Sequence, residues 1–154
     1  MRIGVLADTH MYSAKEIPEK IRKAFSDVDM IIHAGDIVTL EVYRGLKGIT
    51  KTIAVRGNMD LNEVKTMLPE KEEIMVGSKK IGVIHGWGAP QGITQRVRGK
   101  FDNVDAIIYG HSHQGMNSEI EGVLFFNPGQ GSLHYGILEI GDSITGKIYA
   151  IKPV

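Results

Sequence analysis

Five short apolar runs in this chain each end on a small group of aspartate, asparagine, histidine and glycine residues. The runs are rich in isoleucine and valine, and their length and β-branching indicate buried strands rather than helices. With their endings they read "RIGVLADTH", "VDMIIHAGD", "KTIAVRGNMD", "KKIGVIHGWG" and "VDAIIYGHSH". This repetition constrains the fold more than any other feature, because it indicates a sheet in which several buried strands end on similar polar side chains.

Helical patterns lie between these runs. Residues 15–26 place apolar side chains at helical spacing, and residues 39–48 predict a helix capped by Thr39 that ends near Gly48. A third helix is expected within residues 90–101. Alternating strands and helices predict parallel neighbours whose carboxyl ends share one edge, so the five polar endings should converge in space.

The later part of the chain predicts antiparallel hairpins. Their expected turns lie at Gly77-Ser78, Glu121-Gly122 and Gly141-Asp142. Parallel and antiparallel pairs together predict an α/β fold, a four-layer α/β/β/α sandwich of two mixed sheets flanked by helices. We expect a single domain over residues 1–154.

The composition excludes several classes of function. Eighteen basic residues balance eighteen acidic ones, so no overall charge attracts long nucleic acid or an anionic lipid surface. The chain has no cysteine, which excludes disulfides and thiolate metal sites. The apolar start is too short for a signal peptide, and no stretch approaches the roughly 18 apolar residues of a membrane span. We therefore expect a cytoplasmic domain with no membrane partner.

The converging side chains are all oxygen or imidazole donors. They are Asp8, His10, Asp36, Asn58, His85, His111 and His113. Seven donors exceed the need of one four- to six-coordinate ion, whereas two ions sharing a bridging carboxylate would use them all. Paired metals about 3.5–4 Å apart activate water and clamp a phosphoryl group. Ligation by nitrogen and oxygen suits Mn, Fe, Co, Ni or Zn.

These motifs, in this order, resemble the signature of the calcineurin-like metallophosphoesterase superfamily. The length and the "NPG" at residues 127–129 resemble its small prokaryotic phosphodiesterase branch. The resemblance implies the four-layer fold and two divalent transition-metal ions, with Mn favoured. It implies one ion held by Asp8, His10 and His113, another by Asn58, His85 and His111, and Asp36 as the bridge.

The implied reaction is hydrolysis of a small phosphodiester by in-line attack of a metal-activated hydroxide. Asp36, Asn58 and His111 are the expected catalytic residues. One position departs from the family pattern, because Met59 stands where most members have a histidine that assists the leaving group. A thioether gives no proton. We therefore expect weak activity on alkyl phosphomonoesters and better activity on diesters with acidic leaving groups.

Several further residues are candidates for supporting roles. We expect His33 and Asp60 to lie behind the metal ligands, and Arg56, Asn127 and His134 to contact substrate. Three of these also have a plain structural alternative: Asp60 as a turn residue, Arg56 as a solvated strand end, and the 127–132 loop of Asn127 as an ordinary tight turn rather than a phosphate cradle. Trp87 either lines the cleft or packs.

The backbone path through residues 111–113 decides where the two histidines point. If this segment is extended, His111 and His113 face one cleft and Ser112 turns aside.

Two other classes of function are compatible with the sequence. The main alternative function is a protein-interaction scaffold, since a eukaryotic family member in a membrane-trafficking coat uses this fold mainly as a binding surface. A mononuclear hydrolase is a third possibility, and it leaves part of the donor set unexplained. A homo-oligomer is compatible with the sequence.

Overall fold

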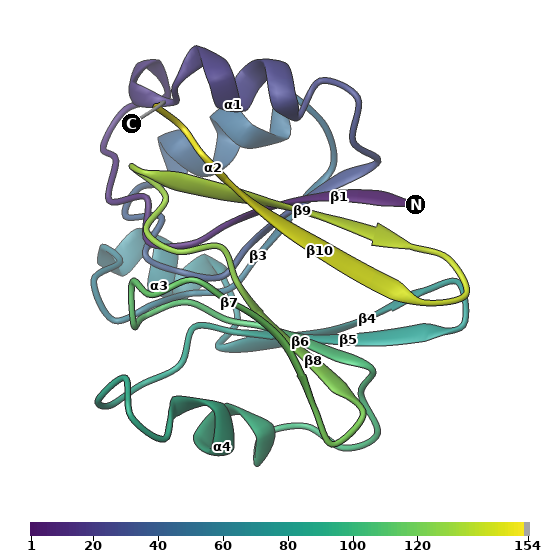
Figure 1. Ribbon diagram of the computed structural model, residues 1–154. Helices are drawn as coiled ribbons and strands as arrows, with labels where there is room; N and C mark the ends of the chain where they lie inside the picture. Colours follow the sequence, from purple (N-terminus) through teal and green to yellow (C-terminus); the bar gives the residue numbers. More distant parts are fainter. Residues whose placement is uncertain (153–154) are drawn as a thin grey trace.

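Two five-stranded sheets lie face to face in the computed structural model, which describes residues 1–152 (Figure 1). The first sheet consists, in spatial order, of β10 (Ile144–Ala150), β9 (His134–Ile140), β1 (Arg2–Leu6), β2 (Met30–His33) and β3 (Thr52–Ala54). The second consists of β4 (Lys71–Val76), β5 (Lys79–Ile84), β6 (Ala106–Ile108), β8 (Val123–Asn127) and β7 (Met116–Ile120). The first sheet has antiparallel pairs on the β10 side and parallel pairs on the β3 side, whereas the second has two parallel pairs between antiparallel edges. Both sheets are therefore mixed, as predicted.

The five apolar runs form five of the six strands that have a parallel neighbour, and the sixth is β8. The first three runs are β1, β2 and β3, and the last two are β5 and β6. The parallel strands of both sheets end at the same edge of the sandwich, on the left in Figure 1. The polar endings therefore come from two facing sheets rather than from one.

Helices cover the two outer faces of the sandwich and complete the four layers. Helices α1 (Glu19–Ala24) and α2 (Leu40–Lys47) lie over the first sheet, and α4 (Ile93–Arg98) lies over the second (Figure 1). Apolar side chains fill the three interfaces between layers, represented by Leu46 outside the first sheet, Val83 between the sheets and Val97 beneath α4. None of the helices in residues 1–152 is long and apolar enough to cross a membrane.

The helix expected over residues 15–26 is divided in the structure. A 3₁₀ turn, η1 (Ala14–Glu16), is capped by Ser13, and α1 begins only at Glu19. Pro18 explains the break, because proline disfavours helical geometry in the residue before it, and Ile17 is extended with φ −62° and ψ 116°. The prediction of one continuous helix was wrong.

Other local predictions are confirmed. Thr39 caps α2 by accepting a hydrogen bond from the Val42 N–H, and the helix ends at Gly48. The hairpins β4–β5, β7–β8 and β9–β10 are antiparallel pairs joined across the predicted turns. The short helix α3 (Asn62–Met67) was not predicted.

Candidate metal centre

The backbone is left-handed at five of the seven predicted metal ligands. Their φ angles are positive in the order 52°, 49°, 59°, 68° and 61° at Asp8, His10, Asp36, His111 and His113. Such angles are uncommon outside glycine and cluster at functional sites, where surrounding structure holds them. The chain thus reaches this edge through sharp bends that turn each side chain inward.

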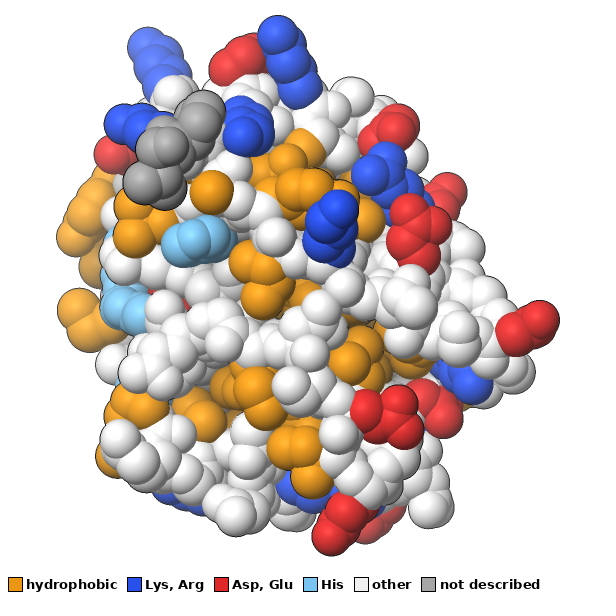
Figure 2. Space-filling view, viewed as in Figure 1, with side chains coloured by type: hydrophobic (Ala, Val, Ile, Leu, Met, Phe, Trp, Pro, Cys, Tyr) orange, Lys and Arg blue, Asp and Glu red, His pale blue; other side chains and the backbone are white. Residues whose placement is uncertain are grey.

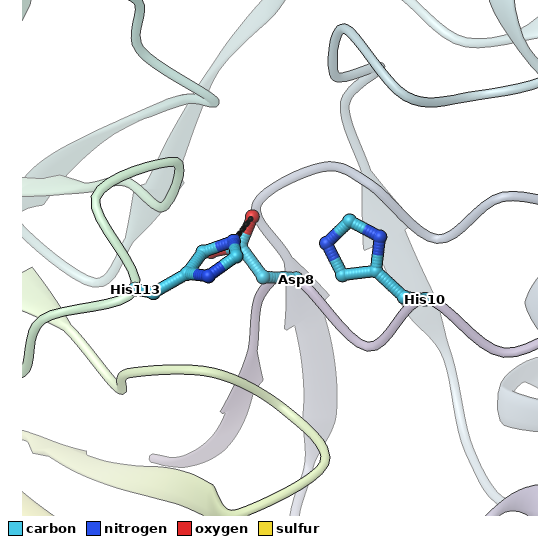
Figure 3. Close-up of side chains that lie close together, drawn as sticks. All are labelled: Asp8, His10 and His113. Atoms are coloured by element: carbon cyan, nitrogen blue, oxygen red, sulfur yellow. Dashed lines mark ion pairs between the residues drawn. The ribbon is translucent and has the colours of Figure 1, made fainter. Parts of the chain in front are cut away.

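Asp8, His10 and His113 form the first group of donors (Figure 3). One donor atom of each lies within 4.8 Å of the others. His113 Nε2 lies 3.6 Å from Asp8 Oδ1, and the His10 and His113 ring centroids are 5.6 Å apart. His113 comes from the second sheet and the other two from the first, so this group spans the facing sheets. Histidine side chains reach the surface at this edge, on the left in Figure 2.

Two buried atoms of this group have no hydrogen-bond partner, which is what a cation site requires. Asp8 Oδ1 and His10 Nε2 are the atoms concerned, although Asp8 is fully buried and its Oδ2 accepts a bond from the His111 N–H at 3.0 Å. Leaving buried polar atoms unpaired costs about 1–3 kcal/mol each. Burial raises the pKa of Asp8 to about 7. A bound cation would satisfy both atoms and favour the charged carboxylate.

His85 is the centre of a second group. Its Nε2 lies 3.3 Å from Asp36 Oδ2, 3.8 Å from Asp8 Oδ1 and 3.1 Å from Asn58 Oδ1. Its Nδ1 donates to the Ala34 carbonyl at 2.8 Å, which leaves Nε2 to face the oxygens. Burial alone would lower the pKa of His85, but the hydrogen bond and charge of Asp36 hold it above its ordinary value. Three oxygens gathered around one imidazole nitrogen again suit a cation.

Asp36 lies between the two groups. Its Oδ2 is 3.6 Å from His10 Nε2 and 3.3 Å from His85 Nε2, while its Oδ1 accepts a hydrogen bond from the Met59 N–H at 2.8 Å. Burial alone would raise the pKa of Asp36, but bonding to His85 holds it below its ordinary value. This carboxylate is therefore charged and faces both groups.

His111 joins the second group through a tight turn and not through an extended segment. The Ser112 N–H donates to the Gly110 carbonyl at 2.8 Å, and both flanking histidines have left-handed backbones. The His111 ring centroid lies 5.2 Å from that of His85, and Nε2 donates to the Gly88 carbonyl at 3.0 Å, leaving Nδ1 free. The extended path considered for residues 111–113 is wrong, and the turn directs the two histidines to different groups.

Asn127, at the end of β8, holds the turn at residues 110–113 through its side-chain amide. It is fully buried, and its amide donates to the Gly110 carbonyl at 3.2 Å and to Ser112 Oγ at 3.1 Å. Its Oδ1 accepts from the Gly129 N–H at 2.9 Å. Both ends of the amide are used inside the protein, so its role in this structure is to hold the turn, and substrate contact by Asn127 stays a prediction. The Gly131 N–H also donates inward, to the Asp8 carbonyl, which favours an ordinary turn over a phosphate cradle.

His33 and Asp60 support the backbone of the loops that bear the donors. His33 is fully buried between Thr9 Oγ1 at 3.0 Å and the Gly35 N–H at 3.1 Å, and burial lowers its pKa to about 3. Asp60 accepts from the N–H groups of Val38 and Gly57, each at 2.6 Å. Burial raises the pKa of Asp60.

A cavity of about 450 Å³ opens beside the second group. Its lining includes Arg56, Asn58, Lys65, Glu70, His85 and Trp87. Arg56 and Trp87 therefore line a cavity that adjoins the second donor group. His134 is half-buried at the start of β9 and does not line this cavity.

Sequence reasoning missed Arg96. Its guanidinium, on α4, donates to the carbonyls of Trp87 at 2.9 Å, Gln91 at 3.0 Å and Ala89. The loop that it holds also carries Gly88, whose carbonyl accepts the bond from His111. The glycines at 86, 88 and 92, all of which have positive φ in the structure, indicate an irregular loop, but nothing in the sequence pairs that loop with Arg96.

Comparison with known proteins identifies the family. The family model described as "Calcineurin-like phosphoesterase superfamily domain" matches residues 1–139. The chain belongs to this superfamily. A probable metallophosphoesterase of Methanocaldococcus jannaschii is 43% identical over 134 residues, which are 84% of this chain and 67% of that protein. A phosphodiesterase of the same archaeon is 30% identical over 148 residues, covering 84% of each chain.

A solved structure shows the same fold. Vps29 from Chaetomium thermophilum superposes with a TM-score of 0.82 at 22% identity, covering 97% of this chain and 90% of that one. At this identity the likeness concerns the fold alone. The resemblance found from the motifs is confirmed, and the superfamily member described here is a metal-dependent phosphoesterase that uses divalent metal ions.

Proposed function

We propose that this superfamily member hydrolyses phosphodiester bonds at a dinuclear metal centre. The observation that carries the proposal is the place of Asp36, whose Oδ2 lies within 3.6 Å of a histidine nitrogen from each donor group. A charged carboxylate between two sets of donors is the arrangement that two neighbouring cations need. A single ion would leave one set of buried donors without a partner.

Asp8, His10 and His113 would hold one ion, and Asn58, His85 and His111 the other, with Asp36 shared. When bound, such ions activate a water as nucleophile and stabilise the charge that develops on phosphoryl oxygens. Manganese is our preferred choice, with Ni, Fe, Co and Zn as the other candidates.

The remaining task of the chain is to hold these donors in place. Backbone groups fix the donor atoms: the Met59 N–H binds Asp36, the Ala34 carbonyl binds His85, and the Gly88 carbonyl binds His111. Partners of this kind set the orientation and protonation of a ligand before the ion arrives. Met59 itself is 57% exposed beside Asp36 and offers no proton to a leaving group.

Metal analysis combined with an aryl phosphodiester assay tests the proposal. We expect two ions per chain at saturation and hydrolysis that depends on Mn²⁺ or Ni²⁺. An alkyl phosphomonoester should be a much poorer substrate than the aryl diester, since general acid help is worth about 10²–10⁴-fold. Fewer than two ions per chain together with no hydrolysis would refute the proposal.

The same metal analysis and hydrolysis assay also distinguish an enzyme from a protein-interaction scaffold. The fold shared with Vps29 keeps that alternative in view. A protein that only binds partners gains nothing from unpaired buried atoms such as Asp8 Oδ1 and His10 Nε2. Their retention favours the enzyme.

A further inference from the structure

The cavity beside the second donor group has an unusual combination of walls. Asn58 and His85 are among its lining residues, so the cavity adjoins the second donor group and can take the part of a substrate that extends beyond it. Its volume of about 450 Å³ lies within the range of pockets that bind small organic molecules. Two cations, Arg56 and Lys65, and the aromatic Trp87 form the rest of the wall that matters here.

The two cations are free to bind an anion. In the part of the chain that the structure describes, no carboxylate lies within 4.0 Å of either one. Arg56 uses one N–H on the Leu68 carbonyl at 3.2 Å, which leaves most of its donors available. Glu70 also lines the cavity, so the wall carries a net positive charge of one from these three side chains. Unpaired cations at the mouth of a phosphoester site indicate a second phosphate.

Trp87 provides a fixed aromatic surface at the same cavity. It is 41% exposed, and Arg96 holds its backbone carbonyl at 2.9 Å. Lys100 Nζ lies 5.2 Å from its ring centroid. A partly exposed ring on an anchored backbone is a suitable platform for a planar base, and base–aromatic stacking is worth about 1–3 kcal/mol.

Met59 narrows the chemistry of the leaving group. The residue after Asn58 is Met59, and the two imidazoles beside Asp36, those of His10 and His85, are both assigned to the ions. No imidazole is therefore left to protonate an alkoxide, so a leaving group that is stable as an anion is favoured. A phosphate leaves as a stable anion, and Arg56 and Lys65 are placed to offset its charge. The missing acid and the cationic wall thus indicate the same kind of bond.

We propose, on the basis of the phosphodiesterase function above, that the substrate is a nucleotide whose phosphate is joined by a phosphoanhydride bond to a second phosphate monoester. The leaving nucleotide is held by Arg56, Lys65 and Trp87. Water adds to the phosphorus that lies nearer the donor groups, and the bond from that phosphorus to the bridging oxygen breaks. The electron pair remains on the leaving phosphate, the water gives up one proton to solvent, and two phosphate monoesters result.

Substrate comparison with the metal-loaded protein tests this. We expect kcat/KM for P1,P2-diadenosine diphosphate to exceed that for diadenosine monophosphate, which lacks the anhydride, by at least about 100-fold. Arg56→Gln and Lys65→Gln should each reduce this ratio about tenfold, as expected for loss of a charge-assisted contact. Arg44→Gln, an exposed cation on α2, is the matched control and should leave the ratio unchanged. Met59→His should lower the ratio by improving the monophosphate diester.

A binding measurement provides a readout apart from turnover. Trp87 is the single tryptophan of the chain, so its fluorescence reports the cavity directly. Adenosine 5′-monophosphate, the product, should quench this fluorescence, and adenosine should do so at least tenfold more weakly. In Arg56→Gln that preference for the nucleotide should largely disappear.

The outcomes separate this inference from the function on which it rests. If the aryl diester is not hydrolysed, the phosphodiesterase proposal itself fails. If it is hydrolysed but the anhydride is no better than the monophosphate diester, or Trp87 does not respond to the nucleotide, only the present inference is overturned.

Discussion

Individual residues at the centre hold conformations that isolated chains avoid. Left-handed φ at Asp8, His10 and Asp36 costs of order 1–3 kcal/mol per residue, and burying Asp8 adds a desolvation penalty. Supporting contacts from His33 and Asp60 hold the same loops. These supporting contacts offset the cost of the strained backbone and fix the donor atoms before any ligand binds.

The shared position of Asp36 predicts a difference between two variants. Asp36→Ala should abolish aryl diester hydrolysis, because both donor groups lose a common oxygen. Asn58→Ala removes one neutral donor from one group, so residual activity at saturating Mn²⁺ should be at least about tenfold higher than in Asp36→Ala. Steady-state rates with metal content measured in parallel decide this. Equal losses in the two variants would argue against a shared carboxylate.

His33 predicts how stability depends on pH. Its pKa is about 3 in the folded protein and 6.5 for the free side chain, so between these values the unfolded chain binds the extra proton. Its effect therefore favours unfolding increasingly as pH falls from 6.5 towards 3, with a slope of up to about 1.4 kcal/mol per pH unit. In His33→Gln this part of the slope should be lost.

Urea unfolding of wild type and His33→Gln at several pH values from 4 to 7 measures the difference. The comparison between the two proteins removes the contribution of Asp8, whose raised pKa acts in the opposite direction throughout this range. Parallel stability curves for the two proteins would contradict the assignment.

At the scale of elements, the loop between β5 and α4 is a backbone segment organised by one side chain. Arg96 binds three of its carbonyls, and the Gly88 carbonyl within it binds His111. Helix α4 thereby acts on the second donor group without contributing a donor. Position 88 in this loop requires glycine, because its φ is +81° and a side chain there would crowd the Arg96 guanidinium.

Arg96→Ala should therefore weaken metal binding at the second group. Loss of a partner that orients a ligand typically lowers metal affinity about 10–100-fold, and we expect a change at the lower end. Arg98→Ala, in the same helix, removes only a bond to the Phe101 carbonyl and should leave affinity unchanged. Calorimetric titration with Zn²⁺ measures both. An unchanged affinity in Arg96→Ala would show that the loop holds its shape without the clamp.

The sequence predicts these elements well where the signal is local. Strands, hairpin turns and the Thr39 cap follow from side-chain periodicity and turn chemistry, and all are present. The break at Pro18 was legible but outweighed by the apolar spacing around it. The buried amide of Asn127 and the clamp of Arg96 could not be predicted from the sequence. Asn127 bonds a carbonyl and a hydroxyl 15–17 residues away, and Arg96 bonds backbone carbonyls 5–9 residues away. Motif order predicts which donors gather, but not the left-handed turns that direct them.

At the scale of the molecule, the candidate centre joins the two sheets. Strands β1, β2 and β3 of the first sheet lead to Asp8, His10, Asp36 and Asn58, while β5 and β6 of the second lead to His85, His111 and His113. Each proposed ion takes donors from both sheets. A bound ion therefore adds a link between two layers that also meet through apolar contacts such as Phe126 and through the bonds of His85 and His111 to the first sheet.

Metal binding should stabilise the whole molecule rather than one loop. An ion that binds only the folded state, at 100 times its dissociation constant, adds about 2.7 kcal/mol. For a domain of 154 residues this raises Tm by roughly 5–11 °C. Because the ion links the sheets, unfolding should remain a single transition, and its Tm should rise as a whole when the ion binds. Scanning calorimetry with Mn²⁺ and with chelator measures the shift. His113→Ala keeps every donor of the first sheet, so a full shift in that variant would refute the linkage, and a shift of less than half is expected.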